Sequence, residues 1–239
     1  MFPDATLHVH NLVKKFGAFR ALDGISFDLR PGEVLGLVGP NGSGKTTCIN
    51  VIAGLYEPDE GCVSFAGQDL ATLPSHRRAR AGINRTFQSP HPFRSLTVAE
   101  NVAVAASYGG AGRPMDVTKL LASLQLDTVA NRPAHELNSA QQKALDLARA
   151  LATSPRLLLV DELAAGLNPA ELARMAERLR ALAAQGMALL VVEHLMGFID
   201  RVTDRVIVMN AGAEIFSGPM SAAAKDPTVI QVYLGGTHV

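Results

Sequence analysis

One short run near the start of the chain constrains its fold more than any other segment: Gly39, Pro40, Asn41, Gly42, Ser43, Gly44, Lys45, Thr46 and Thr47. It matches the G-x-x-x-x-G-K-[ST] pattern of phosphate-binding loops. The apolar residues 33–38 before it favour a buried parallel strand, and residues 46–53 after it favour a helix. At such a turn, backbone N–H groups and the helix N-terminus surround phosphate oxygens. The run therefore predicts a nucleotide site, in which Lys45 reaches the β- and γ-phosphates and the Thr46 hydroxyl binds Mg²⁺.

The charge balance argues against nucleic acid as the main partner. Lysine and arginine together number 22, as do aspartate and glutamate, so the net charge is zero, whereas phosphate-backbone binding usually shows as a basic excess. The longest apolar runs, such as 187–192, have the length of a strand and fall far short of the roughly 20 residues of a membrane span. The N-terminus lacks a signal-peptide pattern. We therefore expect a soluble, cytoplasmic protein that can dock on a membrane complex.

Three segments of the chain differ in pattern. Residues 1–88 contain the phosphate loop and several short strand patterns, two of them before the loop. Residues 89–155 begin with a breaker-rich hinge and then show only helical patterns, whereas strands and helices alternate again over 156–239. This organisation predicts an α/β protein: a P-loop core with a mostly parallel sheet, an N-terminal antiparallel β region, an inserted α-helical subdomain and C-terminal helices.

Two smaller features have structural interpretations. The basic residues of 76–80 predict a solvated helix face. Cys48 and Cys62 lie in apolar stretches, which predicts small buried side chains in a reducing compartment.

The second half of the nucleotide site is predicted at the end of another strand. Four apolar residues, 157–160, are followed directly by Asp161 and Glu162. Ligands of open α/β sheets bind at the carboxyl ends of the strands. Asp161 is therefore expected to support Mg²⁺, through a bound water or Thr46, and Glu162 to orient the attacking water as general base. The alternative is a pair of acids that ends a strand and caps the next helix.

Two further polar side chains are expected at the same edge of the sheet. His194 follows the apolar pair Val191 and Val192, where it would hydrogen-bond the γ-phosphate or the water. Gln88 follows the short strand pattern 83–87, and its amide would touch Mg²⁺ or the water. The alternatives are that His194 only forms hydrogen bonds within the protein at a strand end and that Gln88 is a solvated glutamine in a loop.

These motifs, in this order, resemble the nucleotide-binding subunits of ABC transporters over almost the whole chain. The resemblance adds three matches: Phe16, where the family places an aromatic ring on adenine; the segment 137–141, where it has its signature; and 166–169 after the catalytic acids. The ATPases of branched-chain amino-acid importers are more similar still, on the segments 84–88, 96–102, 164–169, 192–194 and 232–235.

The resemblance implies ATP and Mg²⁺ as cofactors and a composite site. Two ATPase subunits meet head to tail, and each ATP lies between one phosphate loop and the partner's signature residues, here Asn138, Ser139, Ala140 and Gln141. Gly166, Leu167 and Asn168 would form a loop at the dimer interface. The permease contact is expected near 90–100, with a periplasmic or extracellular solute-binding protein as an indirect partner.

The implied function is ATP hydrolysis coupled to import of branched-chain amino acids or related small polar solutes. The alternatives are another ABC system, for urea or amide import or lipopolysaccharide export, or a soluble ABC ATPase that is not coupled to transport. A GTPase is disfavoured because the Asn-Lys-x-Asp motif is absent from the sequence.

The signature segment departs from the family pattern Leu-Ser-Gly-Gly-Gln. Ser139 and Ala140 fill both glycine positions. Glycine permits close backbone approach and positive φ, and a side chain forced into left-handed geometry costs roughly 1–2 kcal/mol. We therefore expect a weakened signature, which favours a heterodimer over a homodimer. Leu163 in place of a common proline and Asn168 in place of a common aspartate are not expected to abolish activity.

Overall fold

The computed structural model describes residues 7–87, 91–109 and 115–234. Its central element is a six-stranded sheet with the strand order β10-β9-β3-β8-β7-β6. Five strands run parallel, and only the edge strand β10 pairs antiparallel, with β9. The strands of this sheet are β3 (Val34–Val38), β6 (Ile83–Arg85), β7 (Leu157–Asp161), β8 (Ala188–Val192), β9 (Arg205–Asn210) and β10 (Ala213–Gly218).

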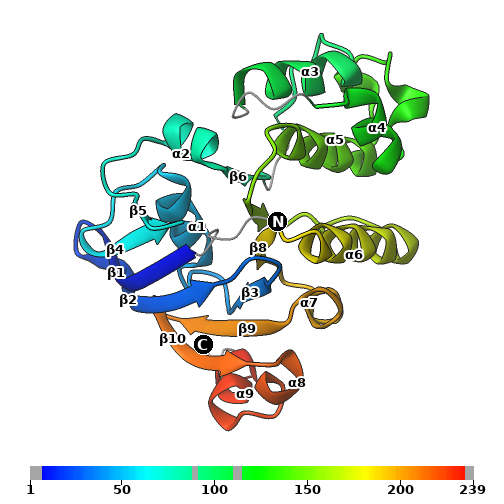
Figure 1. Cartoon of the computed structure of the whole chain (residues 1–239). Helices are drawn as coiled ribbons and strands as arrows, with labels where there is room; N and C mark the ends of the chain where they lie inside the picture. The colour runs from blue at the N-terminus through cyan, green and yellow to red at the C-terminus, as the bar shows by residue number, and fades with distance from the viewer. Residues whose placement is uncertain (1–6, 88–90, 110–114, 235–239) are drawn as a thin grey trace.

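A second, antiparallel sheet lies beside the first (Figure 1). Its order is β2-β1-β4-β5, and it brings together β1 (Leu7–Phe16), β2 (Phe19–Leu29), β4 (Glu60–Phe65) and β5 (Gln68–Asp69). The helix after the phosphate loop, α1 (Lys45–Ala53), packs between the two sheets, and its buried Cys48, Ile49 and Ile52 belong to the same apolar cluster as Leu7 and Leu35. The phosphate loop is therefore anchored to both sheets.

The two faces of the parallel sheet contribute to two separate cores. Because side chains alternate along a strand, Leu157 and Leu159 of β7 join the cluster around α1, whereas Leu158 and Val160 join the cluster on the opposite face. That face is covered by α6 (Pro169–Ala184) and α7 (Met196–Val202). Burial on both faces explains why these strands are continuous apolar runs in the sequence.

The middle of the chain is helical. It contains α3 (Val98–Gly109), α4 (Val117–Ser123) and α5 (Ser139–Ala152), with the short 3₁₀ turns η1 (Asp127–Val129) and η2 (Ala134–Glu136) between the last two. These helices lie to one side of the sheets (Figure 1). The chain ends, within the described residues, in α8 (Met220–Ala223) and α9 (Pro227–Leu234), and α2 (Ser75–Ala81) precedes β6.

The predicted fold class is confirmed, including the antiparallel β region and the helical middle segment. The division of the chain at residues 88 and 155 stays a prediction. Within the described ranges, no helix is long and apolar enough to cross a membrane.

Two predictions about single residues were wrong. Arg78, in the basic run, is not solvated: it is 3% exposed, and its guanidinium donates to the carbonyls of Val51 and Ile52, at the end of α1. It thus supplies donors to carbonyls of the last turn of α1, of which Val51 also accepts from the Gly54 N–H. Cys62 is exposed, because it lies on the outer face of β4, whereas Cys48 is buried as expected.

Candidate nucleotide-binding site

The phosphate loop has a backbone that only glycine fits. Gly39, Gly42 and Gly44 have φ values of 149°, 80° and 102°, and a Cβ atom on Gly44 would lie 2.3 Å from the carbonyl oxygen of Ala21. A Cβ atom on Gly39 would lie 2.2 Å from the carbonyl oxygen of Met209. The glycine pattern therefore follows from tight contacts with neighbouring strands as well as from dihedral angles.

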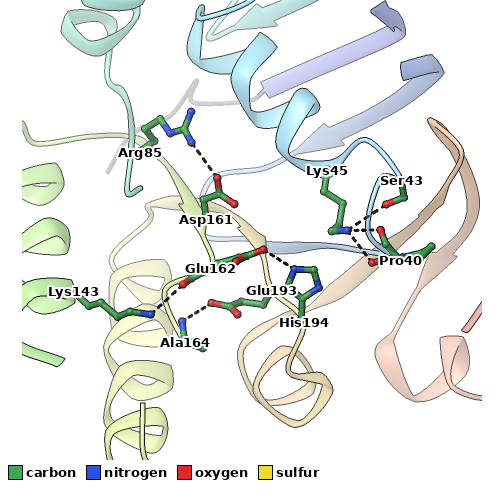
Figure 2. Close-up of polar contacts among 11 residues, drawn as sticks. Pro40, Ser43, Lys45, Arg85, Lys143, Asp161, Glu162, Ala164, Glu193 and His194 are labelled. Carbon is green, nitrogen blue, oxygen red and sulfur yellow. Dashed lines mark hydrogen bonds and ion pairs between the residues drawn. The ribbon is translucent and has the colours of Figure 1, made fainter. Parts of the chain in front are cut away.

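Lys45 begins α1 and folds back over the loop. Its Nζ donates to the carbonyl oxygens of Gly39 and Pro40, at 2.8 Å each, and to Ser43 Oγ at 3.3 Å (Figure 2). Burial lowers the pKa of Lys45, while the charges of Glu162 and Asp161 oppose that shift. The ammonium group is therefore held at the loop, close enough to both predicted acidic residues to feel their charge.

A cavity of about 200 Å³ opens above the loop. It brings together six residues of the loop and its helix with both predicted catalytic residues from the distant strand ends. Its lining consists of Phe19, Ala21, Asn41, Gly42, Gly44, Lys45, Thr46, Thr47, Glu162 and His194. The aromatic ring at its rim is Phe19. Phe16, which the sequence comparison pairs with adenine, is 45% exposed and packs edge-on against Tyr56, with ring centroids 5.3 Å apart.

Glu162 and His194 form a direct contact at the carboxyl ends of β7 and β8. The Nε2 atom of His194 donates to Glu162 Oε1 at 2.6 Å, since an ionised carboxylate only accepts (Figure 2). The two strands are in register through Asp161 and Val192, so the residues that follow meet at the same edge. Glu162 has a left-handed backbone, with φ of 49°, which turns its side chain away from the strand direction toward the cavity.

Asp161 forms an ion pair with Arg85. Its Oδ2 accepts from Arg85 Nη2 at 3.0 Å, and its backbone N–H donates to Thr86 Oγ1 at 3.2 Å. Burial raises the pKa of Asp161, the Arg85 charge opposes this, and Glu162 adds to it. Arg85 also donates to Asn50 Oδ1 at 2.6 Å, so it joins β6, β7 and α1.

The residues predicted for Mg²⁺ have suitable donor atoms. Thr46 is exposed and lines the cavity, and Asp161 directly precedes Glu162, which also lines it; hydroxyl and carboxylate oxygens are the ligands that Mg²⁺ prefers. Among the described residues there is no group of three or more His, Cys, Asp and Glu side chains that could hold a metal. Gln88 lies outside the described residues.

The signature segment lies away from this cavity, at the start of α5. Asn138 caps the helix with φ of −70°: the Gln141 N–H donates to Asn138 Oδ1 at 2.9 Å, and the Asn138 N–H donates to Gln141 Oε1 at 3.1 Å. Neither Ser139 nor Ala140 is among the described non-glycine residues with positive φ. The expected left-handed strain is therefore absent, because these residues start a regular helix rather than a loop.

Asn138, Ala140 and Gln141 line a second cavity, of about 210 Å³, together with Leu167. Leu167 belongs to the loop Gly166, Leu167 and Asn168 that precedes α6. Asn168 caps α6 through bonds of 3.0 Å from the N–H groups of Ala170 and Glu171 to its Oδ1. Asparagine and aspartate serve equally well at such a cap, which explains why asparagine is tolerated here. The catalytic acids do not cap this helix, so that alternative is wrong.

Several residues that the sequence did not single out lie against the site. Lys143 and Glu193 contact the loop after Glu162, Phe19 lines the cavity, and the hydroxyl group of Tyr233 accepts a hydrogen bond from the Gly39 backbone. Glu193 and Tyr233 stand in segments that carry the family resemblance, but that pattern gave no indication of their contacts. For Lys143 no local signal exists, because its contact depends on how α5 packs.

Comparisons with known proteins agree with this geometry. The family model described as ABC transporter matches residues 22–165. A relative from Archaeoglobus fulgidus, named probable branched-chain amino acid transport ATP-binding protein LivG, is 37% identical over 96% of this chain and 95% of that protein.

Solved structures give the same result. A crystal structure of the ADP conformation of an ATP-binding cassette of an ABC transporter superposes with a TM-score of 0.88, at 33% identity over 97% of this chain and 99% of that one. A dimeric cassette in a post-hydrolysis state, bound to ADP and Pi, superposes with a TM-score of 0.81 at 25% identity, over 90% and 98%.

The predicted resemblance, to ABC ATPases of the branched-chain amino-acid type, is thus confirmed over nearly the full chain. With its phosphate loop, its acidic strand end and its helical segment in the expected places, this chain belongs to the ABC transporter family of ATP-binding, ATP-hydrolysing subunits.

Proposed function

We propose that the chain is the ATPase subunit of an ABC importer for branched-chain amino acids or related small polar solutes. The observation that carries the ATPase part is the cavity in which Lys45, Thr46, Glu162 and His194 meet, although they come from three separate parts of the sequence. The import and substrate parts are supported by the relatives, whose names specify branched-chain amino-acid transport.

Within the cavity, each residue has a distinct task. The backbone N–H groups of the loop and the Lys45 ammonium bind the β- and γ-phosphates of ATP. Thr46, Asp161 and Gln88 would hold Mg²⁺, which would neutralise charge on the phosphates. Glu162 accepts a proton from the attacking water, and His194, which already donates to Glu162, fixes the orientation of that carboxylate. Phe16 and Phe19 flank the adenine.

One subunit supplies only part of this site. Its cavity is about 200 Å³, below the roughly 300–1,000 Å³ of most small-molecule sites, and it has no contribution from the signature segment. The exposed Asn138 and Ser139 therefore belong to the ATP bound by a partner, and Gly166, Leu167 and Asn168 lie at the interface. We propose a head-to-tail pair with a second, different ATPase; a pair of identical chains is the alternative.

The permease contact is assigned to the helical segment. A cavity of about 310 Å³ lies between the residues before α3 and those before α5, lined by His91, Pro92, Arg94, Ala134, His135 and Gln142. It overlaps the expected range 90–100, and Phe93 beside it is 48% exposed. Docking there would place the chain on the inner face of the cell membrane, and would connect it indirectly to a solute-binding protein outside.

The role of Glu162 is tested by Glu162→Gln. The amide cannot accept the proton, so ATP turnover should fall by about 10²–10⁴, the usual scale of general acid–base catalysis. Glu177→Gln, at an exposed position on α6, is the matched control and should leave turnover unchanged. A loss below about threefold in Glu162→Gln would show that the general base is another residue.

The transport assignment is tested by recovering the partners. Tagged Glu162→Gln protein is captured with ATP from detergent-solubilised cells, and the co-purifying proteins are identified by mass spectrometry. Two permeases with a second ATPase are the expected result. Recovery of the chain alone, or with soluble proteins only, would contradict coupling to transport, and permeases of an export system would contradict import.

A further inference from the structure

We propose that Lys143 and Glu193 act as a pair of positioning residues that clamp the loop 162–165 and tie the general base Glu162 to the signature helix α5. This inference rests on the proposed function, because it gives the pair a task in ATP hydrolysis. Neither side chain touches the nucleotide cavity; each acts through the backbone of the loop.

Lys143 holds the loop by its carbonyl groups. The side chain leaves α5 and is 7% exposed, and its Nζ donates to the carbonyl oxygen of Glu162 at 3.3 Å (Figure 2). It also donates to the carbonyl oxygens of Leu163, at 3.0 Å, and Ala165. An ammonium group has three N–H donors, so three carbonyls satisfy it completely. A buried lysine with this set of acceptors fixes the direction in which three of the four carbonyl groups of the loop 162–165 point.

Glu193 holds the same loop by an N–H group. It follows β8 directly, is 2% exposed, and its Oε1 accepts from the Ala164 N–H at 2.6 Å. The loop thus lies between the Lys143 ammonium group, which binds its carbonyls, and the Glu193 carboxyl group, which binds its N–H. Because Glu162 is the first residue of this loop and has φ of 49°, its strained backbone is held by the clamp.

The two charges depend on each other. Burial lowers the pKa of Lys143, and the Glu193 charge is the largest influence that opposes it. Burial raises the pKa of Glu193, and Lys143 again opposes the shift. Removing one side chain would leave the other buried without the opposite charge that stabilises its ionised form. The effects of the two substitutions should therefore not be additive.

The position of Lys143 explains what the clamp connects. It lies on α5 just after the capped segment Asn138–Gln141, which is exposed toward the partner's nucleotide in the proposed dimer. A shift of α5 when this segment engages the partner would therefore move the carbonyl of Glu162. The contact links the signature that serves one ATP to the base that serves the other.

The first test is the steady-state kinetics of Lys143→Met, which keeps the length and apolar stem of the side chain without its donors. The kcat for ATP should fall about 10–100-fold, the scale of a misplaced catalytic group, while KM changes less than about twofold because the phosphate loop is untouched. Lys143→Arg keeps the charge and several donors and should recover most of kcat. Lys119→Met, at an exposed position on α4, is the matched control.

The second test is a cycle with Glu193→Gln, whose amide oxygen still accepts from Ala164. The double variant should lose less kcat than the product of the two single losses, because it leaves no unpaired charge. If Lys143→Met does not fold, the single variant Glu193→Gln is the test, and its kcat should fall while KM changes less than about twofold. Unchanged kcat in the folded variants, or a rise in KM that matches the fall in kcat/KM, would overturn the clamp. Absence of turnover in the wild-type chain would instead contradict the proposed function.

Discussion

Helices α1 and α5 both follow a motif of the ABC family, but they begin in opposite ways. The residue before α1, Gly44, has a left-handed backbone and no side chain to cap the helix. The residue before α5, Asn138, has an extended backbone and forms a reciprocal cap with Gln141. The first helix start depends on close backbone contacts, the second on side-chain hydrogen bonds.

This difference changes the meaning of the missing signature glycines. In the phosphate loop, a methyl group on Gly44 would collide with the Ala21 carbonyl. At the start of α5, Ser139 and Ala140 are helical and suit the conformation they adopt. The signature is therefore well folded in the single subunit, and any weakness must come from the Ala140 methyl group against the partner's phosphate.

The largest effect that tests the comparison is expected for Gly44→Ala. The collision with Ala21 cannot be relieved by moving a flexible side chain, so unfolding in denaturant should show a loss of roughly 3–5 kcal/mol, with loss of ATP binding.

Gly42→Ala is the matched control, because a Cβ atom there meets nothing within 4 Å, although φ is also positive. This substitution should lower the free energy of unfolding only by the cost of a left-handed backbone, about 1–2 kcal/mol. Equal losses in the two variants would mean that backbone strain, and not the contact with Ala21, sets the need for glycine.

The second prediction concerns Glu193, which binds the loop 162–165. Burial raises its pKa from 4.5 to about 7. Between these values the folded chain keeps a proton that the unfolded chain has released, so the free energy of unfolding should fall as the pH rises, by up to about 3 kcal/mol.

Glu193→Gln removes this titration. Denaturant unfolding at pH 4.5, 6 and 7.5 should therefore show that the free energy of unfolding of the variant increases relative to that of the wild type between pH 4.5 and about 7. Above pH 7 the difference should change little further. A difference that stays constant with pH would mean that the pKa of Glu193 is the same in the folded and the unfolded chain.

Local patterns predicted the α1 side of the comparison well. The apolar run 157–160 followed by two acids specifies a buried strand with carboxylates at its end, and glycines followed by Lys45 and Thr46 specify a strand-to-helix turn. Each signal lies within a few neighbouring residues. The order of the motifs, which is that of the ABC family, then predicted that they belong to one site.

The contacts that tie the regions together were not predictable in this way. Arg78, Lys143 and Glu193 are buried because distant segments supply their partners: the end of α1 for Arg78, and the loop 162–165 for the other two. A charged residue gives the same sequence signal whether it faces solvent or a set of buried carbonyls. Ala140 was misjudged for the same reason, because a replaced glycine does not reveal its φ.

The third prediction tests the α5 cap. Asn138→Ala removes the acceptor for the Gln141 N–H and should cost about 1 kcal/mol of stability, with lower ATP-driven association of subunits. Asn138→Asp keeps the acceptor and should retain the stability of the wild type. If both variants unfold like the wild type, the reciprocal cap does not hold α5, and the contrast with α1 is lost.

The smallest effect, and the one that decides whether the signature is weak, is expected for Ala140→Gly. Glycine near the start of α5 should cost less than about 1 kcal/mol of stability, because it removes a good helix former without relieving strain. If the methyl group crowds the partner's γ-phosphate, its removal should strengthen ATP-driven association in a Glu162→Gln background by roughly fivefold, equivalent to about 1 kcal/mol. Ser139→Gly alters the adjacent position without removing that methyl group, and should show the stability cost without the gain. Equal or weaker association of Ala140→Gly would mean that Ala140 is accommodated, and the argument for a heterodimer from a defective signature would fail.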